Sequence, residues 1–274
     1  MAGNHRIYYF KDSGIFVLAN VENRLRYFVQ FSYLGTAYHG WQKQPNAPTV
    51  QEVMEMCFTN LLRIPIELVA AGRTDSGVHA HEMYAHFDID MPLESETIIS
   101  RLNSFLPGDI AVKQIIPVAS DAHARFSALQ RTYNYTIVKR KDPFSIQTAH
   151  YSKLAYDVEL MNKAAELLIG LKDFECFSKS RTDVKTFMCD VRYARWEEKE
   201  GRLIFIISAD RFLRNMVRAV VGTLLDVGLG KRSLKDVKTI IKNKDRRLAG
   251  ASVPAKGLSL VRVQYPEEML HHYG

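Results

Sequence analysis

The chain has 274 residues, of which 47% are hydrophobic and 24% are charged, as in a soluble globular protein of one or two domains. Its three cysteines include no CxxC pair, which argues against a disulfide framework or a zinc ribbon and favours a reducing compartment, the cytoplasm. The apolar runs are too short to cross a membrane. The net charge of +7 favours binding to polyanions but specifies neither a fold nor a function.

Residues 1–23 are expected to be an extension outside the fold, and residues 24–128 an N-terminal α/β half. Apolar residues alternate from Arg24 onwards and predict a strand. Thr49 and Glu52 form a capping-box pattern in front of a helical apolar stripe. The full expected order is strand 24–35, helix 49–63, strand 66–71, strand 78–89, helix 94–107 and strand 109–118.

Residues 129–274 are expected to form a C-terminal half with the same order of elements. It reads as strand 131–140, helix 157–169, a hairpin over 191–209 that turns at Gly201, helix 211–227 and closing strand 258–266. Strand–helix–strand–strand–helix–strand is the ferredoxin-like order. We therefore predict an α+β protein in which two ferredoxin-like halves join their mixed or antiparallel sheets around a central basic cleft. Such a fold serves RNA-binding modules, small enzymes and regulatory domains alike.

The stretch AAGRTDSGVHAH, residues 70–81, places one carboxylate, Asp75, beside Arg73 on a turn flanked by glycines. An aspartate is an anion at neutral pH and a nearby guanidinium stabilises that form, which suits a nucleophile or an electrostatic stabiliser better than a general acid. Gly72 and Gly77 allow a ligand to approach the backbone closely. The alternative is an ordinary Asp-Ser-Gly surface turn, and spacing alone favours it.

Three histidines follow this turn, and such a group can bind zinc. His79 and His81 would share one face of a strand, whereas His86 would lie on the opposite face. No second cluster of acids or histidines completes a site in the nearby sequence. We therefore favour structural or polar contacts for these side chains over the alternative of a metal hydrolase.

A nearly all-apolar helix is predicted over residues 211–227 and should be buried. Arg211, Arg214 and Arg218 lie along one stripe of this helix at helical spacing. A buried arginine without a partner is costly, so Arg218, the deepest in the helix, needs an acid or a phosphate, and Asp75 is the candidate. A solvated helix edge is the alternative, and it applies more readily to the other two arginines.

The stretch HARFSALQRTYNY, residues 123–135, interleaves basic and aromatic side chains. Arg125, Arg131 and Tyr133 belong to this mixture, which suits phosphate contacts combined with base stacking. Tyr133 and Tyr135 face the same side of the predicted strand, so at least one of them could simply belong to the core.

Six segments of the chain, in this order, resemble the pseudouridine synthases of the TruA family, which modify the anticodon arm of tRNA. They are YLGTAYHGWQKQP, AGRTDSGVHA, FLPGDIAV, HARFSALQRTYNY, FLRNMVRAVVGTLLDVGLGK and ASVPAKGLSLVRVQYP. The similarity extends over residues 24–266. A single GRTD would be weak evidence, whereas six ordered motifs at the family's spacing are strong evidence.

The resemblance implies roles for individual residues. Asp75 matches the family's nucleophile, and Arg73 matches the arginine beside it, which acts on the RNA when the target nucleotide is extruded. Tyr133 matches the tyrosine that contacts the flipped uracil. Arg218 matches the arginine that pairs with the aspartate, and Leu258 matches an apolar residue of the base pocket.

The resemblance further implies a reaction and its partners. The expected activity is isomerisation of uridine to pseudouridine at position 38, 39 or 40 of the tRNA anticodon stem-loop, with an aspartate nucleophile and base flipping. The family is homodimeric, with one tRNA contacting both subunits, and it uses neither a metal nor an organic cofactor. A tRNA-binding module of the same fold, without chemistry, is the alternative.

Further positions are expected to modulate the RNA contacts. We predict that Arg125, Arg131 and Arg214 contact the substrate. Four positions depart from the commonest family pattern without bearing assigned chemistry: Glu82, Met83, Ala122 and Lys172.

Overall fold

A computed structural model describes residues 24–179 and 184–271, so the predicted extension over residues 1–23 lies outside the described residues. The strands of the described part are β1 (Leu25–Tyr33), β2 (Val69–Ala70), β3 (His79–Ile89), β4 (Ile110–Val118), β5 (Gln130–Val138), β6 (His150–Tyr151), β7 (Gly170–Asp173), β8 (Met188–Lys199), β9 (Arg202–Ala209) and β10 (Leu258–Gln264). Its α-helices are α1 (Val50–Leu62), α2 (Ser95–Phe105), α3 (Val158–Glu166), α4 (Met216–Gly228), α5 (Leu234–Asn243) and α6 (Glu267–His271).

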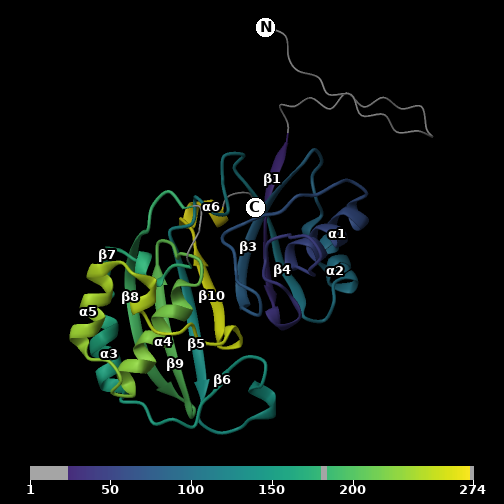
Figure 1. Cartoon of the computed structure of the whole chain (residues 1–274). Coiled ribbons are helices and arrows are strands. Elements are labelled where there is room, and N and C mark those ends of the chain that lie inside the picture. Colours follow the sequence, from purple (N-terminus) through teal and green to yellow (C-terminus); the bar gives the residue numbers. More distant parts are fainter. Residues whose placement is uncertain (1–23, 180–183, 272–274) are drawn as a thin grey trace, which may run out of the picture.

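These strands form one mixed sheet in the order β4-β1-β3-β10-β5-β9-β8-β7, with β2 paired to β3 and β6 paired to β5. The last strand, β10, runs parallel to β3 and antiparallel to β5, and so joins the two expected halves (Figure 1). The prediction of an α+β fold with joined, mixed sheets is confirmed. Because β10 and β3 are parallel, the segments that precede these two strands lie at the same end of the two strands.

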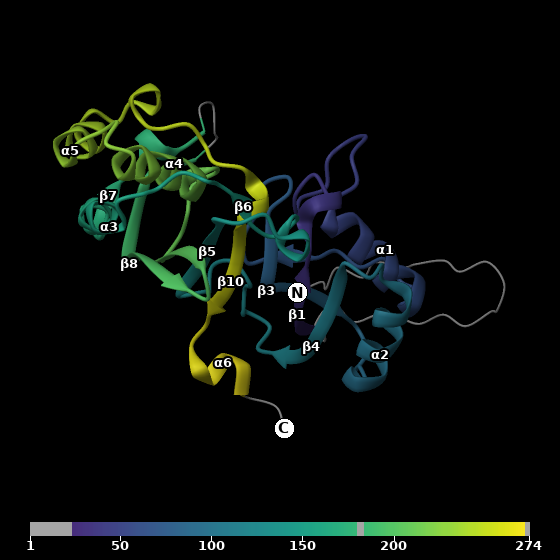
Figure 2. The ribbon, with the colours of Figure 1, turned by 90° about the horizontal axis from the view of Figure 1, so that it is seen from below.

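The helices pack on the sheet in two groups. Helices α1 and α2 lie beside β1 and β4, whereas α3, α4 and α5 lie over β8 and β9, and both views show the groups apart (Figures 1 and 2). Within one continuous core, each half has its own aromatic contacts: Phe58 with Phe87 at 5.2 Å between ring centroids, and Trp196 with Phe205 at 5.0 Å. In the described ranges, no helix has the length and apolar character needed to cross a membrane.

Most predicted elements are present, with ends displaced by a few residues. The Thr49 hydroxyl accepts the Glu52 N–H at the start of α1, as the capping pattern predicts. The strand predicted over 66–71 is reduced to the two residues of β2. The Leu68 N–H bonds at 2.8 Å to the buried carboxylate of Glu55 instead of a neighbouring strand. The helix predicted over 157–169 ends three residues early, and β7 follows.

The prediction of a helix from residue 211 is wrong at its start. Asn215 has a φ of +66°, a left-handed conformation that asparagine tolerates better than most residues, and α4 begins only after it. The Arg211 N–H bonds at 2.7 Å to the carboxylate of Asp210, which fixes a non-helical approach. Arg211 and Arg214 therefore precede the helix, and Arg218 alone of the predicted stripe lies on α4.

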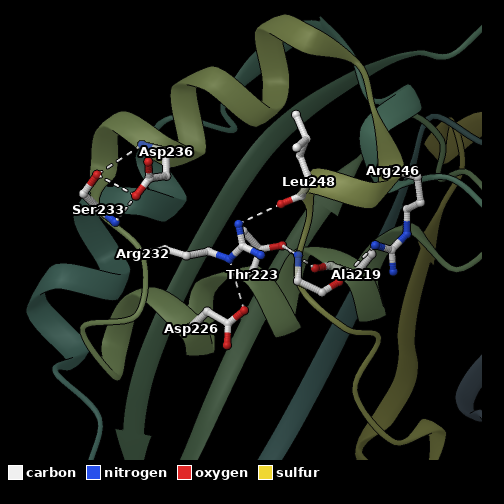
Figure 3. A network of polar contacts seen from close by, with 9 residues as sticks. Ala219, Thr223, Asp226, Arg232, Ser233, Asp236, Arg246 and Leu248 are labelled. Carbon is white, nitrogen blue, oxygen red and sulfur yellow. Dashed lines mark hydrogen bonds and ion pairs between the residues drawn. The ribbon is translucent and has the colours of Figure 1, made fainter.

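A polar network ties α4 to the segment that leads from α5 to β10 (Figure 3). The Thr223 hydroxyl accepts the Gly250 N–H at 2.8 Å. The Arg232 guanidinium donates to Asp226 of α4 at 3.1 Å and to the Leu248 carbonyl at 2.7 Å. Helix α4 is thereby fixed relative to the chain that enters the strand joining the two halves.

The close contact at this place predicts a stability effect. A methyl group at Gly222 of α4 would overlap the carbonyl of Ala251. Even after a gain of about 1 kcal/mol in helix propensity, Gly222→Ala is expected to lower the free energy of unfolding by about 2 kcal/mol, measured by urea denaturation. Gly108→Ala is the control, because its Cβ would meet nothing within 4 Å. Equal stability of the two variants would contradict this packing.

Candidate active site

Asp75 lies on the turn between β2 and β3, and another loop supports this turn from behind. The Trp41 N–H donates to the Thr74 carbonyl at 3.3 Å, and the Gly77 N–H donates to the Tyr38 carbonyl at 3.2 Å. The motif YLGTAYHGW therefore holds the Asp75 turn in place. Alternation and spacing alone do not reveal this role.

Two glycines make the contact between these loops possible. A Cβ at Gly40, where φ is +90°, would overlap the Thr74 carbonyl and lie 3.1 Å from the carbonyl carbon of Asp75. Gly77 has a φ of +76°, which glycine adopts without the steric cost that other residues incur. The turn is thus fixed in shape while the Asp75 side chain remains 23% exposed.

Two arginines of the C-terminal half face the Asp75 carboxylate. Arg218 Nη1 lies 3.6 Å from Oδ2, and Arg214 Nε lies 3.8 Å from Oδ1. The Arg218 Nε–H donates to the Val253 carbonyl at 2.8 Å, which fixes its side chain, whereas the Arg214 side chain is 62% exposed. Both separations exceed hydrogen-bond length, so the guanidinium groups attract the negative charge without binding its oxygens tightly. The contact expected between Asp75 and Arg218 is present.

Tyr133 lies on β5, opposite Leu260 of β10 and Ile207 of β9. Its ring meets Phe212 edge to face, with centroids 5.2 Å apart. Burial and, secondarily, the negative charge of Asp75 raise the pKa of the Tyr133 phenol above its ordinary value. The phenol keeps its proton at neutral pH, so its hydroxyl is a potential hydrogen-bond donor. Sequence reasoning did not single out Phe212 as part of this site.

The beginning of β10 lies at the same end of the sheet as the Asp75 turn. Leu258 is buried next to Tyr135 of β5. Both tyrosines of the predicted pair are buried in the core, and the Tyr135 hydroxyl donates to the Pro254 carbonyl at 3.1 Å. A Cβ at Gly77 would lie 3.4 Å from the Cβ of Ala255. The segment that enters β10 therefore lies against the Asp75 turn.

The remaining predicted arginines have different surroundings. Arg73 is exposed beside the turn. Arg125 is also exposed, and its guanidinium lies 5.5 Å from the ring centroid of Phe126. Arg131 is half-buried, and burial lowers its pKa. Its Nη atoms donate to four backbone carbonyls, those of Ala71, Arg125, Ala128 and Asp210. This placement does not favour the expected contact of Arg131 with RNA.

The three histidines do not form a metal site. His79 and His86 are buried, and each accepts a backbone N–H through Nδ1, at 2.9 Å and 3.2 Å respectively. His81 is exposed. Over residues 24–179 and 184–271, no group of three or more His, Cys, Asp or Glu side chains could hold a metal ion.

The four departures from the commonest TruA pattern have structural surroundings. Glu82 accepts the Val263 N–H at 2.8 Å and so links β3 to β10. Met83 and Ala122 are buried in the core. Lys172 lies on β7, at the far edge of the sheet from β3.

A family model described as tRNA pseudouridine synthase matches residues 30–127 and 164–266. The chain belongs to this family. It is 51% identical over 250 residues to tRNA pseudouridine synthase A of Porphyromonas gingivalis, covering 89% of this chain and 98% of that protein. It is 48% identical to the protein of the same name from Parabacteroides distasonis over 245 residues, covering 89% and 97%. The same name is given to a Caldicellulosiruptor bescii protein, 40% identical over 235 residues and covering 85% and 96%. The predicted TruA resemblance is confirmed, and with it the prediction of an isomerase.

The buried His86 predicts a pH dependence of folding. Burial, aided by the charge of Arg26, lowers the His86 pKa from 6.5 to about 4. As the pH falls below 6.5, the unfolded chain takes up this proton first, so the folded state loses stability until the pH reaches about 4.

His86→Asn retains an oxygen for the Ala124 N–H that His86 Nδ1 accepts and removes the titration. Between about pH 7 and about pH 4.5, wild type is expected to lose about 2–3 kcal/mol more folding free energy than this variant, measured by urea denaturation. Parallel pH profiles for the two proteins would refute a neutral, buried His86.

Proposed function

We propose that the protein isomerises uridine to pseudouridine at position 38, 39 or 40 of the tRNA anticodon stem-loop. One observation carries this proposal: Asp75 of the N-terminal half faces Arg218 of the C-terminal half at 3.6 Å. The negative charge of Asp75 contributes, after burial, to the raised pKa of the Tyr133 phenol. Family membership supplies tRNA as the substrate class, and these three side chains supply a nucleophile, its electrostatic partner and a hydrogen-bond donor.

The proposed reaction needs an unprotonated carboxylate and no change of oxidation state. The glycosidic bond between N1 and C1′ breaks, the freed uracil rotates, and C5 is joined to C1′, so no atoms are gained or lost. The Asp75 carboxylate serves three routes: attack on C6 of the ring, attack on C1′ of the sugar, or removal of a sugar proton to give a glycal. Because Arg214 and Arg218 bind its oxygens loosely, the carboxylate keeps lone pairs for the substrate.

The target uridine must leave its stack before any of these routes can begin. Flipping costs a few kcal/mol and is easiest in loops and at the weak ends of stems, which describes positions 38 to 40. Arg73, which is exposed, is the proposed residue that acts on the RNA during extrusion. Tyr133 and Leu258, on adjacent strands, are the proposed contacts of the flipped base. Arg125 and Arg214 are exposed cations for the phosphates.

We further propose a homodimer in which one tRNA contacts both subunits, acting in the cytoplasm. Phe144 and Ile146, which are 97% and 58% exposed, would add apolar area to such a contact. Three free and buried cysteines fit a reducing compartment.

Replacement of the proposed nucleophile tests the function most simply. Asp75→Asn keeps the shape of the side chain but removes the negative charge. Its kcat for pseudouridine formation is expected to fall by about 10⁴-fold or more, while tRNA affinity stays the same or rises slightly because an anion near the phosphates is lost. Both are measured with tRNA from a strain that lacks the endogenous enzyme, by mapping modified positions and by filter binding.

Asp90→Asn is the matched control, because Asp90 is an exposed carboxylate paired with Arg24, and its turnover should equal that of wild type. Product formation by Asp75→Asn would overturn the assignment. Unmodified tRNA after incubation with wild type would instead indicate the non-catalytic binding module.

The role of the phenol is tested by a pair of tyrosine variants. Tyr133→Phe removes the hydrogen-bonding hydroxyl proposed to contact the flipped uracil. It is expected to lower kcat about 100-fold with little change in KM, because this contact forms only after the base has flipped. Tyr135→Phe removes a hydroxyl bonded to the Pro254 carbonyl. It should cost about 1 kcal/mol of stability and leave kcat unchanged. Equal kcat values for the two variants would refute the role of Tyr133.

A further inference from the structure

A guanidinium next to the candidate site makes contacts that family membership does not explain. Arg131 Nη1 donates to the carbonyls of Ala128 and Asp210 at 2.9 and 2.8 Å. Its Nη2 donates to the carbonyls of Ala71, at 2.9 Å, and Arg125. An arginine carries four Nη hydrogens, so all of them are directed at the protein backbone.

These carbonyls belong to three segments that are distant in sequence. Ala71 precedes the turn that carries Asp75, and Asp210 precedes the segment that carries Phe212 and Arg214. The other two carbonyls belong to the loop with the exposed Arg125. One cation thus joins three backbone segments, two of which lead directly to residues of the candidate site.

Arg131 also lies close to Tyr133 on its own strand, in addition to its contacts with the three backbone segments. Arg131 and Tyr133 are two residues apart on β5 and lie on the same face of the strand. The charge of Arg131 also lowers the Tyr133 pKa, against the larger effect of burial. Arg131 therefore links the strand that carries the phenol to the turn that carries the carboxylate.

We infer that Arg131 is a positioning residue that sets the geometry of Asp75, Tyr133 and Phe212 through backbone carbonyls, and that it does not contact the RNA. This inference rests on the proposed function. Reacting groups must be held within a fraction of an ångström, so a loosened backbone lowers the rate of the chemical step before it weakens binding. Loss of an arginine that binds a phosphate would have a different effect. It would weaken RNA binding and make the affinity for RNA less dependent on salt concentration.

Arg131→Lys separates these two roles, because lysine keeps the charge but cannot reach four carbonyls at once. We expect single-turnover kcat to fall about tenfold or more, with KM and tRNA affinity within about twofold of wild type. The slope of log affinity against log salt should not change, and hydrogen exchange should speed up at residues 71–75, 125–128 and 210–214.

Arg26→Lys is the matched control, because Arg26 is also a half-buried arginine that donates to a carbonyl, that of Ala122, at 2.9 Å, and it lies at the opposite end of β3 from the Asp75 turn. It should lose stability and keep its kcat. An unchanged kcat for Arg131→Lys would overturn the inference. Weaker binding with a salt slope reduced by about one would do the same and would make Arg131 a phosphate contact.

A second measurement uses the wild-type protein, in case Arg131→Lys fails to fold. The Nη resonances of Arg131 should show slow solvent exchange and should not shift when an anticodon-arm RNA is added. A shift on RNA binding would contradict the inference. If wild type forms no pseudouridine, the proposed function fails, while slow exchange at Arg131 still decides whether the guanidinium holds these segments together.

Discussion

The attraction between the Asp75 carboxylate and the Arg218 guanidinium is the interaction on which the candidate site depends. The two groups come from different halves of the chain, lie 3.6 Å apart and are each about one fifth exposed. Water between them is reduced, so their attraction exceeds that of a surface pair. Arg218 is also fixed through Nε on the Val253 carbonyl. Because the separation is too long for a hydrogen bond, Arg218 attracts the carboxylate without occupying its lone pairs.

The sheet explains why these groups meet. Strand β10 is the last strand of the chain, yet it is inserted beside β3 of the N-terminal half and runs parallel to it. The turn before β3 and the segment before β10 therefore lie at the same end of the sheet. Strand β5 pairs with the other side of β10 and brings Tyr133 close to this end. Helix α4, which carries Arg218, is held in place by its polar network with the chain that enters β10 (Figure 3).

Sequence patterns predicted what depends on local spacing. Alternation predicted the main strands, Thr49 predicted the start of α1, and the cost of an unpaired buried arginine predicted that Arg218 meets Asp75. Features that depend on local backbone conformation or on contacts between distant segments could not be predicted from residue spacing. The left-handed Asn215 delays α4, so Arg214 reaches the carboxylate from outside the helix. Spacing likewise does not reveal the hydrogen bonds of Arg131 to carbonyls of distant segments, which only the folded chain brings together; its predicted contact with RNA stays a prediction.

A crystal structure of the Asp75→Asn variant bound to an anticodon-arm RNA would show whether Asp75 acts on an extruded nucleotide at the junction of the two halves. We expect one uridine flipped out of the stem-loop, with its base between Tyr133 and Leu258 and residue 75 beside the glycosidic carbon. An RNA bound with all of its bases stacked, or a flipped base placed away from residue 75, would refute this role of Asp75.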